Sequence, residues 1–135
     1  LLPEDYSWPA LEIDIFEGFF YAGQTPDTKA LATTVHWKNS SGDHVMWPAS
    51  YPLNLMLNKP SFSISDWHIY GAYVTNNLIT CYVDDVPVFS MPNMTDRTKK
   101  MSILLNVATG GMVQSPTDNS KFPARMWVDW VRGYK

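Results

Sequence analysis

The stretch Trp8-Pro9-Ala10-Leu11-Glu12-Ile13-Asp14-Ile15-Phe16-Glu17-Gly18 decides how the rest of the sequence is interpreted. It places three carboxylates within six residues, between large apolar side chains. Successive side chains of a strand point to opposite faces. In a strand over Leu11–Glu17, Glu12 and Asp14 therefore share one face and the two isoleucines share the other.

Glu17 has the wrong parity for the face of the other two acids. In a regular strand it would enter the core with the isoleucines, and burying an unpaired carboxylate is costly. One extra residue at about Ile15–Phe16, a β-bulge, returns Glu17 to the face of Glu12 and Asp14. Because bulges are frequent beside active sites, the sequence predicts three acids on one open face.

Composition and charge limit the class of protein. The 135 residues are long enough for a core, and we expect a single domain over 1–135. Aromatic residues make up 14% and charged residues 17%, a composition that favours strands. The net charge of -3 argues against nucleic acid or an anionic membrane as partner. The single cysteine, Cys81, excludes an internal disulfide and predicts a buried thiol.

Strand patterns recur at short spacing with turn-rich joins. No segment has the 18 apolar residues typical of a membrane span. We expect a loop with at most short strands over His44–Pro60, because three prolines interrupt it. Met101–Ala108 is nearly all apolar, as in a central strand covered on both faces. The pattern predicts an all-β antiparallel sandwich. The expected strands are Leu11–Glu17, Leu31–Trp37, Trp67–Thr75, Leu78–Val83, Val86–Ser90, Met101–Ala108 and Met126–Tyr134.

Two glutamates on either side of an aspartate suit the cleavage of a glycosidic bond. One carboxylate attacks the anomeric carbon, and the other stays protonated to release the leaving oxygen. Crowded like charges raise the pKa of at least one member, which supplies an acid near neutral pH. The alternative from spacing alone is a solvated acidic face or a cation site, and spacing does not separate the two.

Five motifs in order resemble glycoside hydrolase family 16. Glu-Ile-Asp-Ile-Phe-Glu after a Trp-Pro resembles its catalytic signature in the bulged Glu-x-Asp-x-x-Glu form. The other four resemble a Trp-His-x-Tyr strand, the hairpin after it, a Leu-Asn-x-Ala-x-Gly-Gly strand and the C-terminal strand of the family. These motifs are Ser65–Gly71, Tyr82–Val88, Ile103–Gly111 and Phe122–Tyr134.

The resemblance implies a jelly-roll sandwich of the concanavalin A-like lectin/glucanase type. It also implies retaining endo-hydrolysis of a β-linked polysaccharide, with no cofactor for catalysis. Glu12 would be the nucleophile, Asp14 its helper and Glu17 the general acid/base. The bulged form is similar to laminarinase-, agarase- and carrageenase-like members, which points to a β-1,3-glucan or a related β-glucan or galactan. Polymeric substrates of this kind lie outside cells, so we expect an extracellular, secreted enzyme.

The family pattern also suggests residues that bind substrate. Trp8 would be a sugar platform, because aromatic faces stack on pyranose rings; the alternative is a core tryptophan. The pair His36-Trp37 resembles a cleft strand that follows the catalytic one, and the alternative is a hydrogen-bonded strand histidine. Asn106 would reach the cleft and bind a sugar hydroxyl.

A structural calcium is implied by the same resemblance, with Asp129 of the C-terminal strand as a ligand. Calcium takes six to eight oxygen ligands. The family's other ligands come from N-terminal chain that this sequence does not contain, so we expect an incomplete site. The three histidines have no metal-ligand spacing, and one cysteine forms no zinc motif.

The length is the main departure from the family pattern. The sequence starts almost at the catalytic strand, without a signal peptide, so the N-terminal strands of the sandwich would be absent. An open sandwich exposes edges and core surface. We therefore expect another polypeptide or a missing N-terminal segment to complete an incomplete jelly roll. The alternative function is a non-catalytic carbohydrate-binding or structural module in a larger virion or cell-surface assembly.

Overall fold

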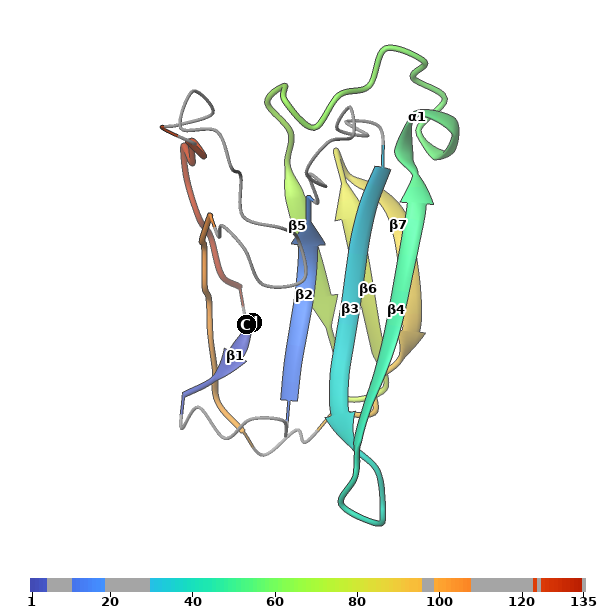
Figure 1. The fold of residues 1–135 in the computed structure, drawn as a ribbon, viewed down its shortest axis with the longest axis vertical. Helices are drawn as coiled ribbons and strands as arrows, with labels where there is room; N and C mark the ends of the chain where they lie inside the picture. Colours follow the sequence, from blue (N-terminus) through green and yellow to red (C-terminus); the bar gives the residue numbers. More distant parts are fainter. Residues whose placement is uncertain (5–10, 19–29, 96–98, 108–122, 124, 135) are drawn as a thin grey trace.

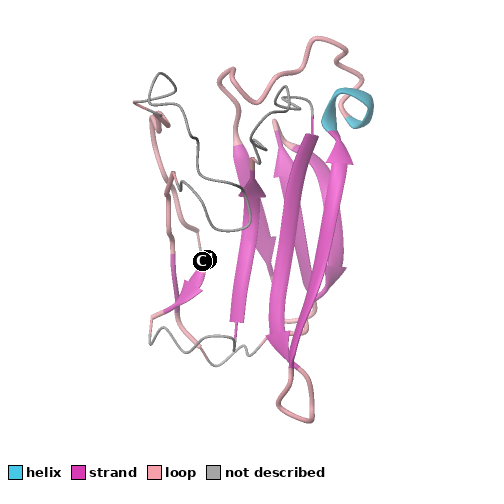
Figure 2. Ribbon diagram, viewed as in Figure 1, coloured by secondary structure: helices cyan, strands magenta, loops and turns pink. Residues whose placement is uncertain are grey.

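The computed structural model describes residues 1–4, 11–18, 30–95, 99–107, 123 and 125–134. In this part of the chain nearly all regular structure is β (Figure 2), which confirms the predicted fold class. The elements are β1 (Leu2–Pro3), β2 (Leu11–Glu17), β3 (Ala30–Lys38), β4 (His44–Pro52), α1 (Leu53–Met56), β5 (Tyr70–Val74), β6 (Leu78–Val83), β7 (Val86–Pro92) and β8 (Met101–Ser102).

Two three-stranded antiparallel sheets lie face to face. One has the order β2-β3-β4 and the other β5-β6-β7, and Figure 1 shows the first in front of the second. A third, two-stranded sheet pairs β1 with β8. Alternate side chains of both large sheets meet in one apolar core, consistent with a jelly-roll sandwich. Its buried members are Ile13, Val35, Trp37, Leu53, Phe62, Ile79, Cys81, Val83, Val88 and Met91.

The bulge in β2 lies where the parity of the acids requires it. Asp14 pairs with Thr34 and Glu17 pairs with Ala32, so two residues of β2 oppose Thr33 alone. The hydroxyl of Thr33 donates to the backbone carbonyl of Ile15 at 3.2 Å, which ties the bulged segment to β3. The prediction of a bulge at Ile15–Phe16 is confirmed.

The expectation of a loop over His44–Pro60 is wrong for its first half. Residues 44–52 form the nine-residue strand β4, which pairs with β3 along its whole length. In the described residues β4 is an edge strand. A proline lacks the N–H that a sheet hydrogen bond needs, and an edge strand tolerates this where the missing donor would face outward. Pro48 and Pro52 therefore mark an edge rather than a break in the sheet.

The hairpins of the second sheet follow the prediction: β5 is shorter than expected at both ends, β6 has the expected bounds, and β7 extends to Pro92. β5 begins at Tyr70 rather than Trp67, because a side-chain network holds the preceding residues in a loop. His68 Nδ1 lies 2.9 Å from Asp84 Oδ2, and its Nε2 lies 2.9 Å from the carbonyl oxygen of Ser63. The turn between β6 and β7 has φ of 50° at Asp84 and 64° at Asp85, as a two-residue hairpin turn of the primed type requires.

Cys81 is buried in the core, as predicted. Burial raises the pKa of the thiol to about 11, although a hydrogen bond with the Thr33 side chain opposes this. The uncharged thiol is therefore the form present at neutral pH, which makes Cys81 a packing residue.

Two predicted strands are wrong in the described part of the chain. Of Met101–Ala108, only Met101–Ser102 pairs with another strand, and residues 125–134 contain no strand. A strand requires a neighbour for its backbone hydrogen bonds. Neither the apolar run of Met101–Ala108 nor the alternation of Met126–Tyr134 ensures one. Their large side chains are mostly exposed, among them Ile103, Leu104, Leu105, Val107, Trp127, Val128, Trp130 and Val131.

The short helix α1 is anchored by the fully buried Leu53. Within the residues that the structure describes, no helix has the length and apolar character needed to cross a membrane.

Candidate active site

Three acids lie on the outer face of the first sheet, and we call Glu12, Asp14 and Glu17 the acidic face. Leu11 and Ile13, which alternate with the first two acids, are both 2% exposed and face the other way. The bulge then brings Glu17 to the same side, since Thr34, the cross-strand partner of Asp14, contacts the Glu17 carboxylate. The structure thus brings the three predicted catalytic residues together.

Hydrogen bonds and close contacts from β3 organise the acidic face. The hydroxyl of Thr34 donates to Glu17 Oε2 at 2.7 Å. His36 is the cross-strand partner of Glu12, and its Nε2 lies 3.3 Å from Asp14 Oδ2. Glu12, Asp14 and His36 each place one ligand-type atom within 4.8 Å of the others. The side chains of Asp14 and His36 are only 20% and 13% exposed, so their contacts are shielded from water.

Crowding and burial change the protonation of Asp14. Burial, and then the neighbouring charges of Glu12 and Glu17, together raise its pKa to about 7. A hydrogen bond between Asp14 and Glu12 favours the protonated form as well. A raised pKa was expected for at least one member of the trio. The structure assigns a raised pKa to the middle acid, Asp14, which lies between the two glutamates.

His36 lies on the acidic face, as the resemblance implied. Burial lowers the pKa of His36, the charges of Glu12 and Glu17 oppose this, and nearby His44 lowers it further. The neutral imidazole is therefore favoured near neutral pH. In that form His36 has one nitrogen that donates and one that accepts.

The position of Trp37 contradicts the prediction that it contacts substrate. Its ring is 9% exposed and is a member of the hydrophobic core. Because Trp37 follows His36 in a strand, its side chain points to the opposite face. The structure therefore places Trp37 between the sheets and not among the residues that face a substrate.

Two further predicted substrate contacts are not brought to the acidic face. Trp8 lies outside the described residues. Asn106 lies in the exposed segment after β8, and in the described part of the chain no hydrogen bond joins it to the acids. Both remain predictions.

Asp129 does not fit a calcium site within the described residues. The segment that carries it is exposed. A calcium ion takes six to eight oxygen ligands. In the ranges that the structure covers, the group of three or more acid, histidine or cysteine ligands is Glu12, Asp14 and His36, which does not include Asp129. No step of the chemistry below uses a metal.

Three residues of this face were missed by the sequence analysis. Thr34 lies two residues before His36 in β3 and therefore on the same face, so the same parity argument would have found it. His44 and Met46 were missed because their segment was expected to be a loop. In β4, Met46 pairs with His36 and is 55% exposed, so it extends the acidic side of the sheet with an apolar surface.

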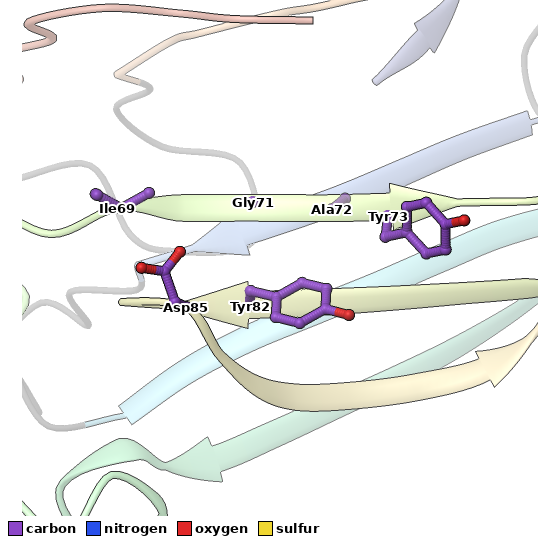
Figure 3. A pocket seen from close by; sticks show the side chains of 6 residues that line it. All are labelled: Ile69, Gly71, Ala72, Tyr73, Tyr82 and Asp85. Carbon is purple, nitrogen blue, oxygen red and sulfur yellow. The ribbon is translucent and has the colours of Figure 1, made fainter. Parts of the chain in front are cut away.

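A shallow pocket lies on the outer face of the second sheet (Figure 3). Tyr82 alternates with Cys81 and Val83, which are buried, so Tyr82 faces away from the core. Figure 3 shows the rings of Tyr73 and Tyr82 projecting from β5 and β6, with the carboxylate of Asp85 at one end. One carboxylate does not provide the pair that glycoside cleavage needs. The pocket is lined by Ile69, Gly71, Ala72, Tyr73, Tyr82 and Asp85.

Comparison with known proteins gives three relatives that align along nearly the whole chain. The endo-1,3-1,4-beta-glycanase EglC of Rhizobium meliloti (strain 1021) is 33% identical over 134 residues, 99% of this chain and 26% of the relative. The endo-1,3-1,4-beta-glycanase ExsH of the same organism is 30% identical over 134 residues, with the same coverage. The clotting factor G alpha subunit of Tachypleus tridentatus is 24% identical over 136 residues, 95% of this chain and 18% of the relative.

No protein-family model matches the chain. The chain spans about a quarter of the length of the curated glycanases that it matches. Their alignment includes the bulged strand and the acidic face, because it covers 99% of the sequence. The chain is therefore a homologue of endo-1,3-1,4-beta-glycanases over nearly its whole length, as the resemblance of its motifs indicated.

Proposed function

We propose that the protein containing this chain is a retaining endo-β-glycanase of glycoside hydrolase family 16. The observation that carries the proposal is the acidic face: a bulge in β2 sets three carboxyl groups on the outside of the sandwich. Contacts from Thr34 and His36 organise two of them. The similarity to two endo-1,3-1,4-beta-glycanases supports hydrolysis of a β-glycan.

The proposed reaction has two steps. In the first, a Glu12 carboxylate oxygen bonds to the anomeric carbon, while Glu17 gives its proton to the glycosidic oxygen and the bond to the leaving sugar breaks. In the second, Glu17 accepts a proton from water, and the water oxygen displaces Glu12 from the anomeric carbon. Two displacements restore the original anomeric configuration.

Asp14 and its neighbours support these two glutamates. With a pKa of about 7, Asp14 is protonated in a large fraction of molecules at neutral pH, and it can donate a hydrogen bond to Glu12. This bond would hold the nucleophile in one orientation and share its charge as the covalent intermediate forms and breaks. Thr34 fixes Glu17 from the other side, at 2.7 Å.

The substrate that we propose is a β-1,3-glucan or a related β-glucan or galactan. The bulged signature supports the β-1,3-glucan, and the names of the two glycanases support including glucans with mixed β-1,3 and β-1,4 linkages among the polymers to test. Such polymers are extracellular, so we also propose that the enzyme is secreted.

The test is a reducing-end assay of the protein on a panel of β-glucans and galactans. The wild-type protein should release new reducing ends, and Glu12→Gln should abolish release with an unchanged circular dichroism spectrum. Glu4→Gln is the matched control, because Glu4 is exposed and lies outside the acidic face. Hydrolysis by Glu12→Gln at the wild-type rate would contradict the assignment of the nucleophile.

Proton NMR of the first product distinguishes retention from inversion. A retaining enzyme gives the β-anomer before mutarotation. Early appearance of the α-anomer would exclude Glu12 as a covalent nucleophile while leaving glycan hydrolysis intact.

We propose that further polypeptide covers the exposed segments of this chain. Large apolar side chains of 103–107 and 126–134 are about half exposed or more, and contiguous apolar surface of this kind marks an interface. The matched glycanases are about four times as long as the aligned region, which is consistent with such a segment. Activity of this chain alone at the full rate on a β-glucan would contradict the proposal.

A non-catalytic glycan-binding or structural module is the second candidate. It is favoured by one observation, the similarity to a protein whose name describes a clotting factor subunit and not a hydrolase. Binding to immobilised β-glucan without release of reducing ends would support this candidate over the first.

A further inference from the structure

A hydrogen bond joins two histidines beside the acidic face. His36 Nδ1 lies 2.9 Å from His44 Nε2, and their rings are 13° from parallel with centroids 5.1 Å apart. The other nitrogen of His36, Nε2, lies 3.3 Å from Asp14 Oδ2. His36 is therefore placed between His44 and Asp14, with one ring nitrogen close to each.

This arrangement restricts where the proton of His36 can lie. A neutral imidazole has one N–H donor and one acceptor nitrogen. With the proton on Nε2, His36 offers a donor to the Asp14 carboxyl oxygen, and Nδ1 accepts the N–H of His44. With the proton on Nδ1, the lone pair of Nε2 would face an acceptor oxygen of Asp14. The first tautomer is therefore preferred as long as His44 donates from Nε2.

Other charged groups lie near this pair on two strands. Glu12, Asp14 and Glu17 lie on β2, and Lys38 of β3 is the cross-strand partner of His44. The glutamates favour a charged His36, whereas burial and His44 favour the neutral form, with burial the largest effect. His44 is exposed.

We propose that His44 is a positioning residue, which holds His36 in the tautomer that donates from Nε2 to Asp14. His36 in turn orients the Asp14 carboxyl group beside the Glu12 nucleophile. His44 contacts His36 and acts through it. The catalytic consequence rests on the proposed function, because it requires that Asp14 assists Glu12.

The test uses two substitutions at His44 and a matched control. His44→Phe keeps an aromatic ring beside His36 and removes the donor. His44→Gln keeps an N–H donor on a flexible side chain. Lys38→Gln is the control, because it removes a positive charge from the neighbouring exposed position without removing a histidine. His44 is exposed on an edge strand, so all three proteins should fold.

Nitrogen-15 NMR of the histidine rings reports the tautomer without any substrate. In the wild-type protein the His36 ring should carry its proton on Nε2. In His44→Phe the Nδ1-protonated form should appear and the pKa of His36 should rise, because the donor and the lowering effect of His44 on that pKa are lost. His44→Gln should restore the Nε2-protonated form, and Lys38→Gln should leave it unchanged.

Steady-state kinetics on a β-glucan gives the second measurement. A neutral hydrogen bond contributes about 0.5–1.5 kcal/mol, which corresponds to a decrease of about two- to tenfold in kcat for His44→Phe. KM should change little, and His44→Gln should recover most of the rate.

Each outcome decides between the inference and the proposed function. An unchanged His36 tautomer in His44→Phe would overturn the inference, whatever the activity. A changed tautomer with unchanged kcat in an active enzyme would overturn the catalytic role of His44. If the wild-type protein hydrolyses no β-glycan while His36 changes tautomer as expected, the proposed function fails and the positioning of His36 by His44 stands.

Discussion

The Thr34 hydroxyl of β3 donates a 2.7 Å hydrogen bond to Oε2 of Glu17, the residue of β2 that follows the bulge. Thr34 is 9% exposed, so water does not readily replace it as a donor. The bond fixes the acid that follows the bulge relative to the two acids that precede it, because Thr34 is the cross-strand partner of Asp14.

Thr34→Val should lower kcat on a β-glucan without unfolding the protein. Valine has nearly the same shape and suits a strand, but it cannot donate to Glu17. Loss of one hydrogen bond to a carboxylate is expected to decrease kcat about tenfold, equivalent to about 1.4 kcal/mol. Thr34→Ser retains the hydroxyl and should stay near the wild-type rate. Equal rates for the valine and serine variants would show that this bond does not orient Glu17 for catalysis.

Asp14 should make the protein less stable as pH rises through the weakly acidic range. Its pKa is about 7 in the folded protein and near the usual 3.8 when unfolded, so between these values the folded state holds a proton that the unfolded state has lost. The free energy of unfolding therefore falls as pH increases from about 4 to about 7. Asp14→Asn removes this dependence, and its Tm should fall less than that of the wild type between pH 5 and pH 8.

The expected difference in Tm is a few degrees, since about 1 kcal/mol shifts the Tm of a domain of this size by a few degrees. Asp66→Asn is the control, because Asp66 is exposed and lies far along the chain from the acidic face. Parallel pH dependence of Tm in the wild type and Asp14→Asn would contradict a raised pKa at Asp14.

Removal of one bulge residue should preserve the acidic face. Deletion of Ile15 leaves Phe16 alone opposite Thr33, while Glu17 stays opposite Ala32. The three acids then remain on one side, and we expect reduced but measurable hydrolysis. Deletion of Ile13, which lies between two acids and not in the bulge, would turn Glu12 toward the core and abolish hydrolysis.

Reducing-end release by the two deletion variants, with circular dichroism to confirm the fold, checks this comparison. Activity in the Ile13 deletion and none in the Ile15 deletion would reverse the expected order. That result would show that the bulge supplies more than the parity of Glu17.

The sequence alone determined the parts of the fold that depend on alternation and on short-range turn chemistry. The bulged strand, the strand after it and the hairpins of β5, β6 and β7 follow from side-chain period and from turn residues such as Asp84 and Asp85. The acids of β2 could be placed on one face for the same reason, because the period of a strand is fixed by its backbone.

The tertiary structure decided the features that depend on which strands lie next to one another. A segment that contains proline can pair as a strand if the side without N–H donors is the outer edge of the sheet. The sequence does not show where that edge lies, so β4 was missed, and with it His44 and Met46. Whether an apolar segment becomes a strand depends on a partner for its backbone, which Ile103–Val107 does not have in the described residues.

The same distinction applies to the candidate site. The sequence supplied Glu12, Asp14 and Glu17, but not which of them has its pKa raised, because that depends on burial and on the charges around Asp14. The sequence also could not decide which of the adjacent residues His36 and Trp37 faces the acids. In the structure His36 does, and Trp37 lies in the core. Covalent geometry fixes alternation along a strand, whereas only the packing of one sheet on another decides which face is buried.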